Sequence, residues 1–172
     1  MTVAQLDDPI DFALPGVAWL AGRPLAIEPT GTGRAVARRH GERLVVGGGS
    51  RAQVLAAIDR WYRREARGAI EPLVESEGER LGLEAKKVSV RAQRTRWGSC
   101  STSGTLSFNW RLVIGRPEAL RYVVVHELIH IRHHNHSREF WADLEAAFPR
   151  YREEAAWLRE HERSLLRWRP LI

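Results

Sequence analysis

Residues 126–130 read His126-Glu127-Leu128-Ile129-His130, an H-E-x-x-H motif. Apolar residues around the motif recur at helical spacing, and Pro117 stands where a first-turn proline belongs, so we predict a helix from Pro117 to about His133. Two imidazoles four residues apart share one face of such a helix and can reach the same zinc ion. Glu127, next to the first ligand, is predicted to be the general base that takes a proton from water acidified by the ion.

A catalytic zinc ion usually has three protein ligands, and five of the seven histidines lie between positions 126 and 136. In a continued helix His134 would lie about 12 Å along the axis from His126, too far to share one ion, and His133 would point away. His136 can turn back if the helix ends near position 135, where asparagine tolerates left-handed backbone. We therefore predict that His126, His130 and His136 bind Zn²⁺, with His133 and His134 outside the ligand set.

The N-terminal half predicts strands followed by a long helix. Residues 1–16 read as a loosely held lead-in, and residues 17–46 as short strands punctuated by glycine and proline, with a hairpin turn at His40-Gly41. Ser50 and Gln53 form a capping-box signature that begins a helix over 50–81. Pro72 is expected to kink this helix or to begin a second one.

The C-terminal half predicts a β-hairpin and three helices. Val88–Ala92 and Thr105–Leu112 alternate apolar and polar residues and read as the two strands of the hairpin. Ser137 is a good N-cap for a helix that Pro149 stops, and a charged helix over 150–167 closes the chain. The expected fold class is α+β, with residues 17–172 as one domain and its catalytic core over 86–148.

Three segments together resemble the YgjP-like metallopeptidase family, which is related to the SprT-like proteases: Arg96–Cys100, Phe108–Leu112 and Val124–Trp141. The resemblance is densest over residues 86–148. It implies a minimal zincin core, in which the active-site helix packs on a small mixed or antiparallel sheet. It also implies zinc ligands at His126, His130 and His136, a catalytic glutamate at Glu127, and an edge strand beside the helix that can hold an extended peptide.

Four residues near this hairpin are candidates for substrate binding: Arg94, Arg96, Asn109 and Arg111. The alternative role for the arginines is an ion pair with Glu118 or Glu139. We expect the tryptophans at 97, 110 and 141 to be core residues. Cys100 is the single cysteine, so it cannot form an internal disulfide, and we expect a small buried side chain rather than a nucleophile.

The chain has 172 residues and a net charge of +6, and all but two of its 27 basic residues are arginine. The leading hypothesis is a zinc metallopeptidase that cleaves polypeptides, and the arginine excess is compatible with action on DNA-associated proteins. One alternative is a metal-dependent hydrolase of nucleoside triphosphates, with arginines clamping the phosphates. Another is a non-catalytic nucleic-acid-binding domain with structural zinc, whose phosphate contacts are Arg60, Arg63, Arg64 and Arg67. No leader or membrane-spanning stretch is evident, so we expect a cytoplasmic protein without membrane contact.

Overall fold

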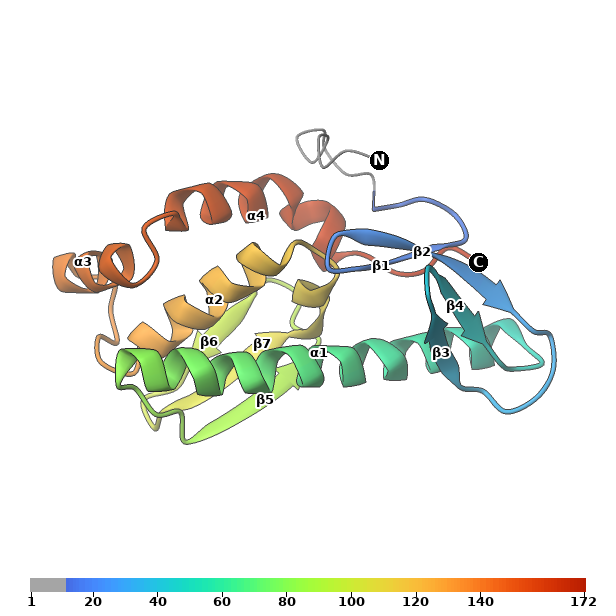
Figure 1. Ribbon diagram of the computed structural model, residues 1–172, viewed down its shortest axis with the longest axis horizontal. Coiled ribbons are helices and arrows are strands. Elements are labelled where there is room, and N and C mark those ends of the chain that lie inside the picture. Colours follow the sequence, from blue (N-terminus) through green and yellow to red (C-terminus); the bar gives the residue numbers. More distant parts are fainter. Residues whose placement is uncertain (1–11) are drawn as a thin grey trace.

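The computed structural model describes residues 12–172, and in this range four α-helices pack against two small sheets, which confirms the α+β class (Figure 1). The first sheet has the order β1-β2-β4-β3 and confirms the strands predicted over 17–46. Its strands are β1 (Val17–Leu20), β2 (Arg23–Pro29), β3 (Ala37–His40) and β4 (Arg43–Val46). β3 and β4 form the predicted hairpin, with His40 opposite Arg43, whereas β2 and β4 are parallel.

The long helix α1 (Arg51–Leu81) runs past both sheets (Figure 1). Ser50 caps its first turn by accepting a hydrogen bond from the Gln53 backbone N at 3.3 Å, as the capping box predicts. The helix continues through Pro72 without a second start and ends at Gly82, whose φ of 63° is the left-handed conformation that glycine adopts freely. Pro72 therefore removes one helical hydrogen bond without dividing the helix.

The second sheet differs from the predicted hairpin. It has the order β5-β7-β6, with β5 (Lys87–Arg91), β6 (Gly98–Cys100) and β7 (Thr105–Asn109). β5 pairs with β7 in parallel, and β6 forms the antiparallel partner of β7. The segments that begin at Val88 and Thr105 were predicted to pair antiparallel as a hairpin. This prediction was wrong, because the chain between β5 and β6 crosses to the other edge of β7 and the two segments pair in parallel. β6 is left as an edge strand.

The remaining helices are α2 (Pro117–Ile129), α3 (Arg138–Ala147) and α4 (Tyr151–Leu166), preceded by the 3₁₀ turn η1 (Trp110–Val113). α2 begins at Pro117 and α3 follows the predicted cap, in which the Ser137 hydroxyl accepts from the Phe140 backbone N at 3.4 Å. Contacts of α2 with α1, with β6 and with α4 place it at the centre of this half of the molecule (Figure 1).

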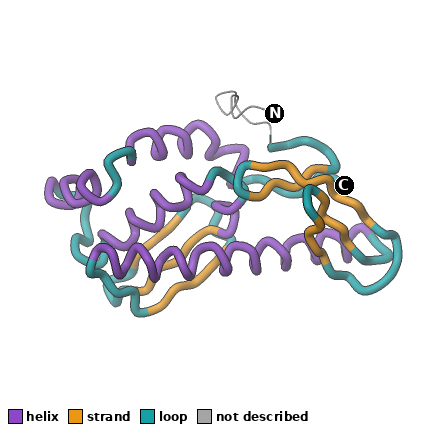
Figure 2. Tube along the Cα trace, in the orientation of Figure 1, coloured by secondary structure: helices purple, strands orange, loops and turns teal. Residues whose placement is uncertain are grey.

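α2 ends four residues earlier than predicted. After Ile129 the backbone tightens, with Ile131 N donating to Leu128 O and Arg132 N donating to Ile129 O, both at 3.0 Å. These bonds span three residues, as in a 3₁₀ turn, and they reverse the chain without a left-handed residue. Among the described non-glycine residues only Ala21 has a positive φ, so the expected role of Asn135 as a left-handed hinge was wrong. Figure 2 shows the segment between α2 and α3 as a loop.

Two hydrophobic clusters lie on different faces of α2. The larger cluster joins α1, the two sheets and one face of α2, and it contains the fully buried Tyr62 and Phe108. Trp110 belongs to it as predicted, and Trp97 packs against it half-buried. The smaller cluster joins α2 to α3 and α4: Val125, Ile129, Phe140, Leu144, Phe148 and Tyr151. α2 is therefore held on both sides, which fixes the side chains that it presents at its open face.

Phe12 is 1% exposed, so the end of the expected loose lead-in is attached to the fold. Its ring packs edge-on against Trp19 with centroids 5.3 Å apart, and its carbonyl oxygen accepts a hydrogen bond from Trp168 Nε1 at 2.8 Å. Gly16 N also donates to Leu171 O at 2.7 Å. The rest of the lead-in, residues 1–11, lies outside the described residues.

Three of the four arginines proposed to contact phosphates bond within the chain. Arg60 donates to Ala35 O at 2.7 Å, Arg64 donates to Ala37 O at 3.4 Å, and Arg63 pairs with Asp59 at 2.7 Å. The bonds of Arg60 and Arg64 tie α1 to β3 and the loop before it, whereas the Arg63–Asp59 pair lies within α1. All three bonds occupy side chains that a phosphate-binding face would need. Over residues 12–172, no helix combines the length and apolar character that a membrane crossing requires.

Candidate metal centre

α2 presents His126, its C-cap residue His130 follows one turn later, and the loop after α2 returns His136 to the same place. Nε2 of His136 lies 3.1 Å from Nε2 of His126 and 3.1 Å from Nε2 of His130. In the part of the chain that the structure describes, the donor atoms of these three histidines all lie within 4.8 Å of one another. They form a group that could hold a metal ion.

The spacing of these nitrogens fits a single tetrahedral zinc ion. Zinc–nitrogen bonds of 2.0–2.1 Å place two tetrahedral ligand atoms roughly 3.3 Å apart, and the two Nε2 distances here are 3.1 Å. The His130 ring lies with Nδ1 2.9 Å from the His133 carbonyl oxygen. Because a carbonyl only accepts, Nδ1 carries the proton and the lone pair of Nε2 faces the site.

Burial keeps two of these imidazoles neutral. Burial, reinforced by the neighbouring His130 and His136, lowers the pKa of His126 to about 3. Burial also lowers the pKa of His130, although its bond to the His133 carbonyl acts in the opposite direction. A neutral imidazole is the form that binds a metal, so the fold favours the ligand form of both side chains.

Two aromatic side chains of α3 support the histidines. Phe140 is buried and stacks on His130 with ring centroids 4.5 Å apart. Trp141 stacks on His136 at 5.5 Å and, on its other side, on Tyr151 at 5.8 Å. Trp141 is 38% exposed, so the prediction that it is a core residue was wrong. α3 turns Phe140 inward, and Trp141, the next residue along the helix, therefore lies at the rim of the site.

Glu127 lies against the edge strand β6. The side chain is buried, and a Cβ atom added to Gly98 would lie 2.7 Å from both Cγ and Oε1 of Glu127. Only glycine allows this approach without a shift of the carboxylate. Burial raises the pKa of Glu127 to about 7. Gly98 was not among the predicted site residues, although a glycine inside a strand is a recognised sign of close approach.

A cavity of about 380 Å³ opens beside Glu127 and His126. Arg96, in the loop before β6, and Gly98 of β6 line one part of it, and Arg159 and Glu162 from α4 line another. The two α4 residues were not predicted as site residues. They lie on the exposed face of an amphipathic helix, and only the packing of α4 against α2 brings them to the cavity.

Of the four predicted substrate-binding residues, the structure brings only Arg96 to this cavity. Arg94 is exposed elsewhere. Arg111 donates to Trp168 O at 3.2 Å and lies over the Trp110 ring at 4.4 Å, away from the histidines. In residues 12–172 no ion pair joins Arg94, Arg96 or Arg111 to Glu118 or Glu139, so the alternative prediction for these arginines was also wrong.

The side chain of Asn109 has a structural role. It is fully buried at the end of β7, and its Nδ2 donates to Gln93 O at 2.7 Å and to Arg96 O at 3.2 Å. Its Oδ1 accepts from the Arg111 backbone N at 3.1 Å. The side chain therefore holds the crossover between β5 and β6 and has no face toward a substrate.

Three further residues near the centre have defined surroundings. His133 is half-buried with its Nε2 2.9 Å from Asp143 Oδ2, and His134 is exposed. Cys100 is half-buried at the end of β6, where burial and the charge of Glu127 raise the pKa of its thiol. A raised pKa disfavours the thiolate that a nucleophile or metal ligand requires.

The chain is similar to a known protein family and to a solved structure. A family model described as YgjP-like, metallopeptidase domain, matches residues 4–161. A solved structure, the metallopeptidase zymogen of Pyrococcus abyssi abylysin, is similar at 24% identity and a TM-score of 0.49, covering 60% of this chain and 99% of that chain. No curated protein matches the chain.

Proposed function

The chain belongs to the YgjP-like metallopeptidase domain family, and on this premise we propose that it is a zinc peptidase that hydrolyses polypeptides. His126, His130 and His136 would hold the ion, and Glu127 would act as general base. One observation carries the proposal: three Nε2 atoms converge with 3.1 Å contacts beside a buried carboxylate. A structural zinc site would give that carboxylate no catalytic role.

A bound zinc ion supplies a Lewis acid that acidifies water and polarises the scissile carbonyl. Glu127 receives a proton from the attacking water on a carboxylate oxygen while a C–O bond forms at the carbonyl carbon. It then delivers that proton to the amide nitrogen as the C–N bond breaks, which releases a new carboxyl end and a new amine. Burial suits Glu127 to both steps, because it raises the pKa of the side chain to about 7, near neutral pH.

The edge strand β6 supplies a means of holding the substrate. β6 pairs with β7 on one side only, so its other side offers backbone donors and acceptors to an extended peptide. Gly98 lies in this strand against Glu127, so a peptide paired with β6 would run past the general base. The cavity lined by Arg96 and Arg159 would receive a substrate side chain next to the scissile bond.

Polypeptide cleavage is the direct test. A reduced and alkylated model protein is incubated with zinc-loaded wild type and with Glu127→Gln at equal zinc occupancy, in water enriched in ¹⁸O. Wild type is expected to produce fragments with one ¹⁸O in each new carboxyl end, and Glu127→Gln is expected to produce none. Fragments formed equally by both proteins, or an intact substrate with both, would contradict the proposal.

A parallel incubation with single-stranded DNA tests a nucleic-acid partner. Faster cleavage with DNA would support action on DNA-associated proteins. An unchanged rate would argue against it while leaving the peptidase proposal intact. Nucleoside triphosphate with the same two proteins tests the phosphoanhydride alternative, for which we expect no hydrolysis.

A further inference from the structure

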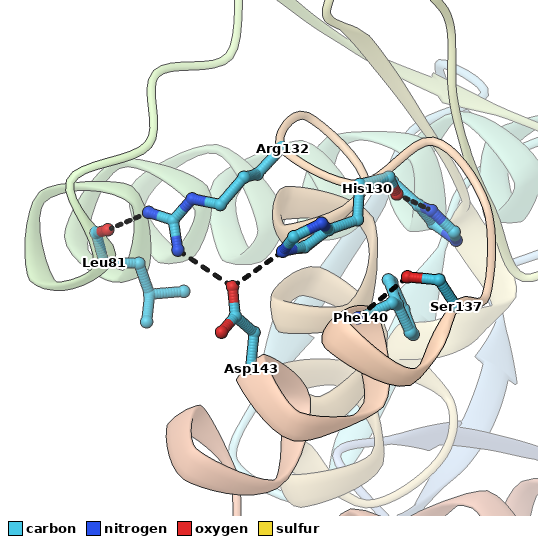
Figure 3. Close-up of polar contacts among 7 residues, drawn as sticks. Leu81, His130, Arg132, Ser137, Phe140 and Asp143 are labelled. Carbon is cyan, nitrogen blue, oxygen red and sulfur yellow. Dashed lines mark hydrogen bonds and ion pairs between the residues drawn. The ribbon is translucent and has the colours of Figure 1, made fainter.

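A network of side chains surrounds the loop that carries His136. Asp143 on α3 accepts two hydrogen bonds on its Oδ2 atom, from Arg132 Nη1 at 3.0 Å and from His133 Nε2 at 2.9 Å. Arg132 also donates from Nη2 to the carbonyl of Leu81 at 3.4 Å, at the end of α1. Figure 3 shows Arg132 between Leu81 and Asp143. One carboxylate thus ties α3 to the loop, and through Arg132 to the long helix.

The same network reaches a predicted ligand through the backbone. His130 Nδ1 donates to the carbonyl of His133, the residue whose ring Asp143 holds. That bond orients the His130 ring and keeps its Nε2 lone pair on the site. Three positions of one short segment therefore depend on each other: the ring of His130, the backbone of His133 and the ring of His136, which is 3.1 Å from His130.

Beyond His133, this segment has little to define its path except the contacts of the His136 ring with Phe140 and Trp141. No helix or strand lies between α2 and α3, and after His133 N, which donates to Ile129 O at 3.0 Å, the next backbone–backbone bond described is that of Trp141 N to Ser137 O at 3.2 Å. Of the two histidines that are not ligand candidates, His133 is turned inward onto Asp143 while His134 is exposed. An inward polar ring needs a partner, and the carboxylate supplies it.

From this geometry we infer that Asp143 is a positioning residue for the metal centre. It acts on His130 through the His133 carbonyl and on His136 through the path of the loop, and it touches neither the ion nor the substrate. The inference rests on the proposed function in one respect, that the three histidines bind zinc. Asp143 itself is outside the group of described side chains that could hold the ion.

The test compares Asp143→Ala with Glu145→Ala. Glu145 is an acidic residue of the same helix, and its ion-pair partner is Arg152 of α4 rather than a residue of the loop. Zinc dissociation constants are measured by competition with a chromophoric chelator, and the visible spectrum of the Co²⁺ form reports ligand geometry. Asp143→Ala should weaken zinc binding by about 10–100-fold and alter the Co²⁺ bands. Glu145→Ala should leave the zinc dissociation constant within about twofold of the wild-type value and the Co²⁺ bands unchanged.

Two further variants separate positioning from stability. In the metal-free proteins, the thermal midpoint shows whether Asp143→Ala still folds, and if it does not, the isosteric Asp143→Asn is measured in its place with a smaller loss of affinity expected. His133→Ala combined with Asp143→Ala should lose little more affinity than Asp143→Ala alone, because both changes break one path.

The outcomes distinguish the two claims. Wild type that binds zinc tightly, with Asp143→Ala and Asp143→Asn binding it equally well, would overturn the positioning role alone. A loss of zinc affinity in the double variant equal to the sum of the losses caused by His133→Ala and Asp143→Ala separately would also overturn it. Wild type that fails to bind zinc would overturn the proposed function, and this inference with it.

Discussion

Gly98 and Glu127 lie so close that one added carbon on the glycine would come within 2.7 Å of the glutamate's Cγ and Oε1 atoms. An edge strand and the predicted general base therefore share one surface. The relationship joins two functions of the site, since the strand that would hold the peptide also limits where the carboxylate can lie.

Gly98→Ala is expected to lower kcat roughly 10–100-fold, because a displaced base loses its alignment with the attacking water. Zinc affinity should stay at the wild-type value, since the three atoms nearest the added methyl group all belong to Glu127 and none to a histidine. Steady-state kinetics and chelator competition measure the two effects. Gly68→Ala, where an added Cβ meets no atom within 4 Å, is the control. A normal kcat in Gly98→Ala would show that the close approach has no part in catalysis.

The third ligand can be tested within one loop. His136→Ala should raise the zinc dissociation constant by more than about 100-fold, because losing a ligand costs more than losing its support. His134→Ala, two residues away and exposed, should bind zinc as wild type does. Chelator competition on both variants decides the assignment. If His134→Ala weakened zinc binding and His136→Ala did not, His134 would be the third ligand.

Glu77 should stabilise the fold in a pH-dependent way. The residue is 5% exposed on α1, and Arg121 and Arg80 bond to its carboxylate. Burial alone would raise its pKa, but the hydrogen bonds and charges of the two arginines outweigh burial and leave the pKa lowered from its usual 4.5. A lowered pKa means that this stabilisation is complete above about pH 5 and is lost as the pH falls through the folded-state value.

Glu77→Gln is therefore expected to lower the free energy of unfolding by about 2 kcal/mol at pH 7, with a smaller loss at pH 4 and below. Urea unfolding of the metal-free protein across this range measures the difference. Glu79→Gln, an exposed glutamate on the same helix, should change little at any pH. A deficit that stays constant from pH 7 to pH 3 would contradict the assigned linkage.

Asn109 should be needed for stability. Asn109→Ala leaves the carbonyls of Gln93 and Arg96 without their donor, so the free energy of unfolding is expected to fall by about 1–3 kcal/mol. Denaturant unfolding of the metal-free protein checks this value. Asn135→Ala removes an exposed asparagine and serves as the control. Equal stability of the two variants would mean that the crossover holds without the amide.

Local signals in the sequence predicted most of the helices and the composition of the candidate site. The H-E-x-x-H spacing places two histidines on one helix face, and the caps at Ser50 and Ser137 and the first-turn proline Pro117 marked three helix starts that the structure confirms. These features need only neighbours within one or two turns. What they could not indicate depends on residues far apart in the chain.

The pairing of β5 with β7 is one such feature. The segments at 88 and 105 alternate as hairpin strands do, but the bonds of Asn109 to the crossover place β6 on the opposite edge, and a buried amide leaves no periodic signal. The early end of α2 is another. It follows from the three-residue turns after Ile129 and from the contacts of His133, which only the folded α3 provides.

X-ray absorption at the zinc edge, on protein loaded with one equivalent of zinc, shows whether His126, His130 and His136 share a single ion beside Glu127. We predict three imidazole nitrogens at about 2.0–2.1 Å with an additional oxygen and no sulfur at about 2.3 Å. Loss of the ion during buffer exchange, or a sulfur neighbour from Cys100, would contradict it.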